Sequence, residues 1–417
     1  MLMILGIPVV FALLAAPMIE VIVSGDKTFL TLILQRLYGG IDSFPLMALP
    51  FFILAGEVMN YGGITAKIVG LSQSIIGHLR GGLAQVNILS SILFAGLSGS
   101  AVADTSALGS MLIPAMEKNG YSRKFAAAIT AASSIIGPII PPSGIMILYA
   151  FIMNVSVGGL FAAGVVPGIM VGLGLMGLTY FLAKKRNYPV ASSPASMNEI
   201  WVALKTGFLP LLTPVIMLGG ILSGVFTPTE AAAVAAGYAI ILALLSKALR
   251  LRDLRKLFLN TAVNSGVILL LVGAAVSFSS FVSLSGAAQT MSSTLLALTD
   301  NVYLLLFFIN ILLLIVGMFL DAGPAILILG PILGPAVISM GVEPLHFAVI
   351  MCVNLTIGLA TPPMGLVLFV SASLTGDKVE AIAKEMFPFL ALEIIIMFLI
   401  TFFPALVLTV PRLLGFL

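Results

Sequence analysis

Apolar residues fill this chain in long blocks, separated by short stretches that carry most of its charge. A membrane helix needs about twenty apolar residues, and blocks of this kind include 202–226, 231–246, 268–284 and 387–410. The blocks are apolar on every side, whereas the strands of a membrane barrel alternate between apolar and polar positions. The pattern therefore predicts an all-α polytopic membrane protein, whose helices satisfy their own backbone hydrogen bonds.

The composition agrees with this class. Of the 417 residues, 60% are apolar and 8% are charged, whereas about a quarter of the residues of a soluble protein are charged. The first block, 1–23, lacks a basic leader and a small-residue cleavage site, so we expect it to be the first membrane helix. The single cysteine, Cys352, lies in an apolar block, which argues against a disulfide framework and predicts a buried packing residue.

The chain contains an internal repeat. A shift of 221 residues places 96–144 on 317–365 without a gap, and 15 of the 49 positions are identical. Glycines and prolines dominate the matches. The repeat predicts two halves, 1–183 and 201–417, joined by a polar cytoplasmic linker at 184–200.

Loop charges indicate that the two halves have opposite orientations. The linker begins with a Lys-Lys-Arg run, which marks a cytoplasmic end. The basic loop 118–124 falls on the same side, but its counterpart 339–346 has no Lys or Arg. Conversely, loop 376–385 carries two lysines and its counterpart 154–159 is uncharged. Corresponding loops that face opposite sides are typical of inverted-topology repeats.

Each half also contains a tip of small residues between short apolar segments. In the first half the tip is GLSGSAVADT at 96–105, and in the second half it is GMFLDAGP at 317–324. We expect the flanking segments to be too short to span the membrane alone. The pattern predicts re-entrant hairpins at about 83–117 and 303–340.

A second interruption follows in each half. The motifs GPIIPPSG (137–144) and GLATPPMG (358–365) lie midway along apolar runs, and each Pro-Pro pair removes two backbone donors. They predict broken helices at about 125–155 and 346–375. Freed carbonyls suit a sodium ion, and the N-termini of half-helices suit an anion. A single Pro-Pro pair could be a simple kink in close packing, but its duplication favours a binding site.

Polar side chains are few in these interruptions. Asp104 and Asp321 carry most weight, because an aspartate costs roughly 3 kcal/mol in the membrane interior; alternatively, each could cap a helix N-terminus. Glu57, Asn60 and Asp42 could line a cavity, although helix-end positions explain them equally well. The remaining polar candidates are Ser98, Ser100, Thr105, Ser143, Asn354, Thr356 and Thr361.

With its duplicated motifs, including GLSGSAVADTSALGSMLIP and IIGPIIPPSG, the chain resembles the large membrane subunit of tripartite ATP-independent periplasmic (TRAP) transporters over nearly its whole length. The resemblance implies an elevator-type transporter driven by sodium, with the hairpins and broken helices forming a moving transport domain. It also implies two partners, a small four-helix membrane subunit and a periplasmic substrate-binding protein. The expected location is the bacterial inner membrane.

The resemblance implies two sodium sites and one substrate site. The first sodium site would use Ser98, Gly137 and Ile140. The substrate-binding residues would be Ser100, Asp104, Thr105, Ser143 and Asp321, and the second sodium site would use Gly317, Gly358, Thr361 and Met364. No other metal and no organic cofactor is expected.

The leading hypothesis is sodium-coupled uptake of a small carboxylate, such as a C4-dicarboxylate or a sialic acid. An ion-coupled carrier that needs no binding protein is the alternative. A channel and an intramembrane aspartyl protease built on Asp104 and Asp321 are weaker hypotheses, because the tips close from both sides and the surroundings of the two aspartates differ. The sequence has no phosphate-binding GxxxxGK[ST] loop that would indicate ATP use.

Overall fold

The computed structural model describes residues 7–24, 28–189, 194–286, 290, 299 and 301–417, and the regular elements within these residues are helices. Eight helices are long and apolar enough to cross a membrane, or nine if a bent pair counts as one span. The prediction of an all-α polytopic membrane protein is confirmed.

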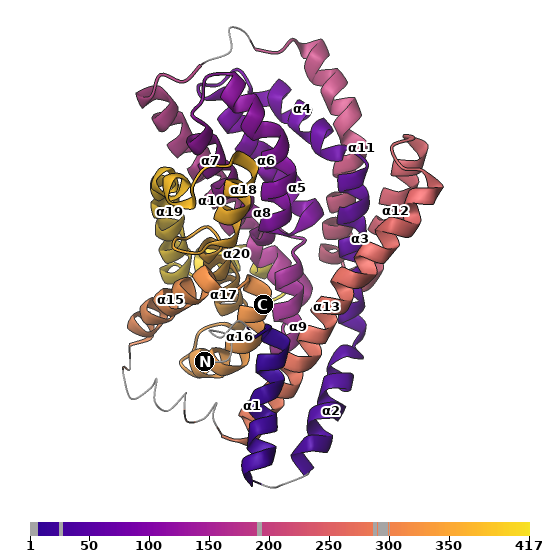
Figure 1. Ribbon diagram of the computed structural model, residues 1–417, viewed down its shortest axis with the longest axis vertical. Coiled ribbons are helices and arrows are strands. Elements are labelled where there is room, and N and C mark those ends of the chain that lie inside the picture. The colour runs from indigo at the N-terminus through magenta and orange to yellow at the C-terminus, as the bar shows by residue number, and fades with distance from the viewer. Residues whose placement is uncertain (1–6, 25–27, 190–193, 287–289, 291–298, 300) are drawn as a thin grey trace.

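One group of helices stands on the right in Figure 1. Within it α12 packs along α3, and α13 packs along both α1 and α2. Three of the four long predicted blocks lie here, and each of their helices begins earlier than its block. The group comprises α1 (Val9–Ser24), α2 (Thr28–Ile41), the short η2 (Phe44–Met47), α3 (Ala48–Tyr61), α11 (Met197–Leu222), α12 (Pro228–Leu245) and α13 (Leu251–Leu284).

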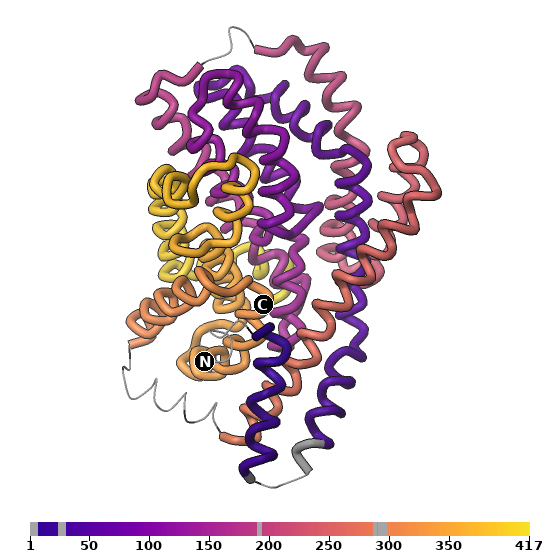
Figure 2. Tube along the Cα trace, in the orientation of Figure 1, coloured from indigo at the N-terminus to yellow at the C-terminus, as the bar shows by residue number. Residues whose placement is uncertain are grey.

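A second group holds both predicted hairpins and both Pro-Pro motifs, and its crowded path is easiest to follow in the tube view (Figure 2). Helix α4 (Ile64–Ile76) joins the two groups, since it packs against α5 of the second and α11 of the first. The group comprises α5 (Gly82–Ser98), α6 (Ala101–Lys118), α7 (Arg123–Ser134), α8 (Ile136–Ile139), α9 (Gly144–Met153), α10 (Val157–Lys185), α15 (Val302–Phe319), α16 (Ala322–Ser339), α17 (Pro344–Gly358), α18 (Leu366–Thr375), α19 (Val379–Phe402) and α20 (Ala405–Leu413).

The helices beside the tips are longer than predicted. Only Gly99 and Ser100 separate α5 from α6, and only Leu320 and Asp321 separate α15 from α16. Helices α15 and α16 have 18 residues each and are apolar enough to cross a membrane, so the expectation that they are too short is wrong. The physical reason is capping: the Ser100 hydroxyl accepts from Ala103 N, and Asp321 Oδ1 accepts from Ala322 N.

Two other predicted boundaries are corrected. The block 387–410 is not one helix, because α19 ends at Phe402 and α20 begins after Pro404, a residue that cannot donate a backbone hydrogen bond. The polar linker is shorter than 184–200, since α10 continues to Lys185 and α11 starts at Met197 with Ser196 as its N-cap. Of the first block, the described part forms the 16-residue α1.

The first Pro-Pro motif interrupts its helix as a bend. The path from α7 and α8 into α9 turns by 41° at the break. In the second half, α17 ends at Gly358 and α18 starts at Leu366, so the turn is longer there. Both interruptions leave short, non-helical backbone inside the second group of helices.

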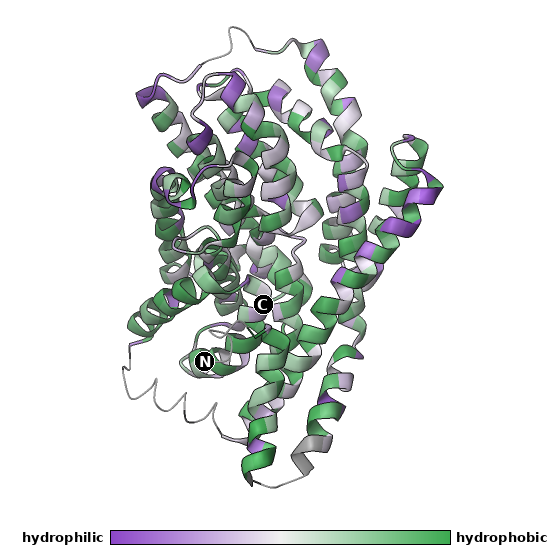
Figure 3. Ribbon diagram, in the orientation of Figure 1, coloured by the Kyte–Doolittle hydropathy of each residue, from purple (hydrophilic) through white to green (hydrophobic). Residues whose placement is uncertain are grey.

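Contacts between loops show which loops share an end of the molecule. Arg186 pairs with Glu385 at 2.6 Å, and Arg123 Nη1 donates to the Thr375 carbonyl at 3.2 Å. At the other end, Gly159 packs against Leu345, whose Cδ1 would lie 2.9 Å from an added Cβ. Hydrophilic residues gather at the upper end of the view in Figure 3, where the α10–α11 and α12–α13 connections lie.

Candidate functional site

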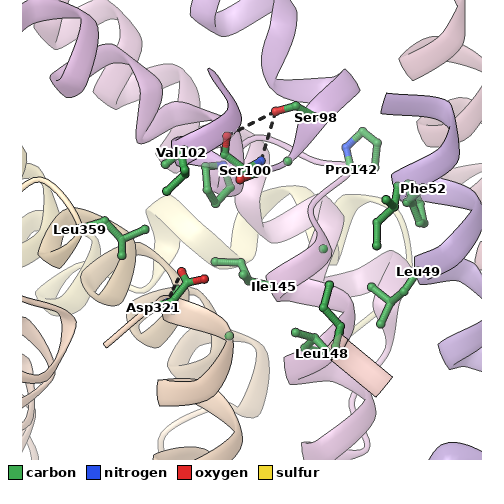
Figure 4. A pocket seen from close by; sticks show the side chains of 18 of the residues that line it. Leu49, Phe52, Ser98, Ser100, Val102, Pro142, Ile145, Leu148, Asp321 and Leu359 are labelled. Carbon is green, nitrogen blue, oxygen red and sulfur yellow. Dashed lines mark hydrogen bonds between the residues drawn. The ribbon is translucent and has the colours of Figure 1, made fainter. Parts of the chain in front are cut away.

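The two tips and the two Pro-Pro interruptions meet around a central cavity of about 330 Å³. Helices α3 and α13, from the other group, also line it, and Figure 4 shows Leu49 and Phe52 of α3 across the cavity from Asp321. Its lining residues are Leu49, Phe52, Ile53, Gly96, Leu97, Ser98, Gly99, Ser100, Ala101, Val102, Pro138, Pro142, Gly144, Ile145, Leu148, Val267, Ile268, Leu271, Asp321, Ala322, Gly323, Pro324 and Leu359.

The first tip contains a tight polar contact. The Ser98 hydroxyl donates to Asp104 Oδ1, and the backbone N–H of Ser100 donates to Ser98 Oγ at 3.2 Å. The other Asp104 oxygen, Oδ2, is buried without a hydrogen bond among the described residues and lies where a Cβ of Gly137 would be. Three of the predicted residues, Ser98, Asp104 and Gly137, therefore meet at one point.

Other residues predicted near this tip take different positions. Thr105 is buried and donates to the Ala101 carbonyl at 2.8 Å, with Ser134 Oγ at 2.6 Å. Ser143 is also buried and donates to the Pro138 carbonyl at 2.6 Å. Thr105, Ser143 and Asp104 are not among the residues that line the cavity. Of the five predicted substrate residues, Ser100 and Asp321 line it. Ile140 packs its side chain against Gly168.

The second predicted ion site consists mainly of backbone. Gly317 and Gly358 approach so closely that a Cβ on Gly317 would lie 3.0 Å from Gly358 Cα. Beyond Gly358, the carbonyl oxygens of Leu359 and Thr361 both lie near Gly365, each 2.9 Å from where its Cβ would be, and the Leu359 carbonyl also accepts from Val367 N at 3.1 Å. The Thr361 hydroxyl donates to the Ile357 carbonyl. Met364 is about half exposed, at 49%.

In each half of the chain, a buried polar network joins the helix before the tip to the helix before the Pro-Pro interruption. In the first half, Asn87 on α5 donates to Thr130 on α7 at 2.6 Å. In the second half, Asn354 on α17 donates to Asn310 Oδ1 on α15 at 2.7 Å. Buried hydrogen bonds of this kind fix helices in one register, so they hold the tips against the interruptions. Thr356 donates to the Cys352 carbonyl within α17.

The lining of the cavity contains very few ionisable side chains. Asp321 is the only ionisable residue that lines it within the described chain, and no lysine, arginine or histidine does. The N-termini of α6, α9 and α16 begin beside it and supply partial positive charge. The partial positive charge that faces the cavity therefore comes from helix ends.

Sequence reasoning missed the apolar wall of the cavity. Leu49 and Phe52 of α3, Ile145 and Leu148 of α9, and Leu271 of α13 all line it. No signal could have selected them, because each is one apolar residue in an apolar helix. Glu57 and Asn60 do line a space, a neighbouring chamber, whereas Asp42 lines neither.

The fold is that of a polytopic α-helical membrane protein with an internal cavity beside its helix interruptions. Two solved transporters share the fold: YdaH of Alcanivorax borkumensis has a TM-score of 0.65 and 17% identity, covering 94% of this chain and 88% of that one. MtrF of Neisseria gonorrhoeae has a TM-score of 0.61 and 15% identity, covering 89% and 83%. At these identities the likeness establishes the fold alone.

The family follows from sequence comparison. Residues 1–406 match the family of the tripartite ATP-independent periplasmic transporter DctM component, and the chain belongs to this family. It is therefore a transporter subunit, not an enzyme, and a multi-pass protein of the inner membrane.

Curated relatives cover almost the whole chain. The sialic acid TRAP transporter large permease protein SiaM of Vibrio cholerae is 39% identical over 98% of this chain and 95% of its own length. The C4-dicarboxylate TRAP transporter large permease protein DctM of Pseudomonas aeruginosa is 38% identical over 91% and 89%. The isethionate TRAP transporter permease protein DctMQ of Oleidesulfovibrio alaskensis is 37% identical over 97% of this chain and 64% of its own length.

Proposed function

We propose that this chain is the translocating subunit of a TRAP transporter that uses a sodium gradient to take up a small organic anion. The observation that carries the proposal is the central cavity, where both tips and both interruptions meet. Its volume of about 330 Å³ suits a small molecule. Because no basic side chain in the described residues lines it, a cation must accompany an anionic substrate.

Two features support sodium as that cation. At the first tip, Asp104 retains an unpartnered buried oxygen beside Ser98 and Gly137. At the second Pro-Pro interruption, the carbonyl oxygens of Leu359 and Thr361 both lie close to Gly365. Hard oxygen atoms of these kinds are the ligands that sodium prefers, and unwound helices supply them in secondary transporters. We assign Ile140, Gly317, Gly358 and Met364 to the same two sites.

Two further observations support inverted repeats that move as an elevator. Helices α6 (Ala101–Lys118) and α16 (Ala322–Ser339) have bounds that differ by 221 residues, which is the sequence repeat. Loops that do not correspond share an end: Arg123 contacts Thr375, and Gly159 contacts Leu345. On this proposal the second group of helices slides against α3 and α13, carrying two re-entrant hairpins.

The names of the relatives support a proposal for the substrate class and the partners of this chain. Their names include sialic acid, C4-dicarboxylates and isethionate, all of which are organic anions. We propose a substrate of this class that binds near Ser100 and Asp321. Asp104, Thr105 and Ser143 would support the site from the layer of residues behind the cavity wall. The partners would be a small membrane subunit and a periplasmic binding protein.

Uptake into proteoliposomes tests the proposal. The chain would be reconstituted with its small membrane subunit and given radiolabelled carboxylates and sulfonates, with and without sodium and the binding protein. We expect uptake that requires both. Uptake without the binding protein would favour the independent carrier, and no uptake of any organic anion under a sodium gradient would refute the proposal. The intramembrane protease, the weaker hypothesis, is wrong because the chain belongs to a transporter family; of the two aspartates, only Asp321 lines the cavity.

A further inference from the structure

A second chamber, which we call the vestibule, adjoins the central cavity. Its volume is about 400 Å³. The two spaces share the tip residues Ser98 and Ser100, so the first tip forms the wall between them. The vestibule is lined by Ile53, Gly56, Glu57, Asn60, Phe94, Ser98, Ser100, Ala103, Asn264, Val267 and Ile268.

The order of residues along α3 and α13 shows where the vestibule leads. Along α3, Phe52 lines the central cavity and Asn60 lines the vestibule. Asn60 lies four residues before the start of α4, which is near the upper end of the molecule (Figure 1). Along α13, Leu271 lines the central cavity, whereas Asn264 lines the vestibule, nearer the basic start of that helix. Since basic loops mark the cytoplasmic side, the vestibule lies between the central cavity and the cytoplasm.

The vestibule differs from the central cavity in polarity. Glu57, Asn60 and Asn264 line it, and Glu57 is its only ionisable residue among those described. The Glu57 carboxylate makes no hydrogen bond or ion pair with the described residues. The first tip approaches α3 beside Glu57, because a Cβ on Gly56 would lie 2.9 Å from the Leu97 carbonyl oxygen.

A carboxylate on this route is unexpected for an organic anion but suitable for a cation. A negative charge in a cleft with low-dielectric walls raises the local concentration of cations and lowers that of anions. The vestibule ends at Ser98, whose hydroxyl donates to Asp104 in the first proposed sodium site. Glu57 is thus placed where sodium would arrive or leave.

We propose that the vestibule is the cytoplasmic access route to the cavity and that Glu57 attracts sodium along it, between the cytoplasm and the Ser98–Asp104 site. This deepens the proposed function and rests on its sodium coupling. Glu57 acts here as a positioning residue for the ion, not as a ligand of the central site. The effect comes from the negative charge of its carboxylate.

Reagents of opposite charge can measure the potential in the vestibule. The native cysteine, Cys352, is fully buried, so a cysteine introduced by Asn264→Cys would be the reactive one. We expect cationic and anionic methanethiosulfonates applied from the cytoplasmic side to label this cysteine. The rate of labelling by the cationic reagent, divided by that for the anionic reagent, should fall about fivefold when Glu57→Gln is added. Asn119→Cys, on an exposed turn, is the control whose ratio should not change. An unchanged ratio at Asn264→Cys, or labelling from the periplasmic side alone, would overturn the proposal.

Sodium inhibition from the inside tests the ion itself. In the reconstituted complex, internal sodium should inhibit uptake, and Glu57→Gln should raise the inhibitory concentration about fivefold while leaving the external requirement unchanged. Glu57→Asp should restore the wild-type value, and Glu230→Gln, on the exposed start of α12, should have no effect. Equal inhibition in Glu57→Gln and wild type would refute this inference. Wild-type uptake without any sodium dependence would instead refute the proposed function.

Discussion

Gly317 and Gly358 meet backbone to backbone, and a Cβ on Gly358 would lie 2.5 Å from Gly317 Cα. The residue pair joins α15 to the end of α17, where the second helix interruption begins. Only glycine permits this approach, since the atoms that oppose the added carbon are backbone and cannot rotate away. The contact therefore sets the position of the second tip relative to its broken helix.

Replacing this glycine should damage the site. We expect Gly358→Ala to destabilise the purified protein by about 1–3 kcal/mol through overpacking, and to abolish sodium-dependent uptake. Gly219→Ala is the matched control, because no atom lies within 4 Å of the added carbon in α11. Thermal unfolding and uptake would be measured on both variants, and wild-type uptake by Gly358→Ala would contradict the assignment of this contact to an ion site.

The Ser98 hydroxyl holds the Asp104 carboxylate in place. Ser98→Ala removes the one side-chain hydrogen bond to that group, a loss worth roughly 1–3 kcal/mol for a buried acceptor. We expect a sodium requirement about tenfold higher, since 1.4 kcal/mol corresponds to a factor of ten. The measurement is the sodium concentration for half-maximal uptake, with Ser110→Ala on the exposed face of α6 as control. Equal requirements in the two variants would exclude Ser98 from the ion site.

Arg186 links both halves at the basic end of the molecule. It pairs with Glu385 at 2.6 Å and lies over the Phe125 ring, 5.2 Å from its centroid. Partly buried contacts of these two kinds stabilise by about 1 kcal/mol together, so Arg186→Met should lower the melting temperature by a few degrees. Arg252→Met should not, because the Arg252 side chain is 74% exposed and 3.8 Å from Asp253. A melting temperature that is equal in both variants would show that the link contributes nothing to stability.

Glu393 on α19 is fully buried, and both of its carboxyl oxygens lack hydrogen-bond partners in the described chain. Burial without partners is unfavourable for a carboxyl group, and an apolar residue of similar shape removes that cost. We expect Glu393→Met to raise the melting temperature and to retain uptake. Loss of uptake at an unchanged or higher melting temperature would instead identify Glu393 as a functional group that sequence inspection overlooked.

The class of protein and its main interruptions were predictable from local features. Hydropathy sets the membrane helices because each must satisfy its own backbone in lipid. The two Pro-Pro pairs were informative since proline removes a donor wherever it occurs. Helix ends were less predictable: the tips proved shorter than expected, because Ser100 and Asp321 cap helices that extend almost to the turn.

The sequence by itself therefore determined the membrane class, the repeat and the positions of the tips and Pro-Pro motifs that line the cavity. Tertiary structure alone decided which oxygens and which apolar faces meet. Asp104 lies against Gly137, 33 positions away in the chain, and Leu49 shares a cavity with Asp321, 272 positions away. A helix that is apolar on all sides carries no periodic signal for its inward face. Packing against neighbouring helices is what turns Phe52 toward the cavity and places Glu57 in the vestibule beside it.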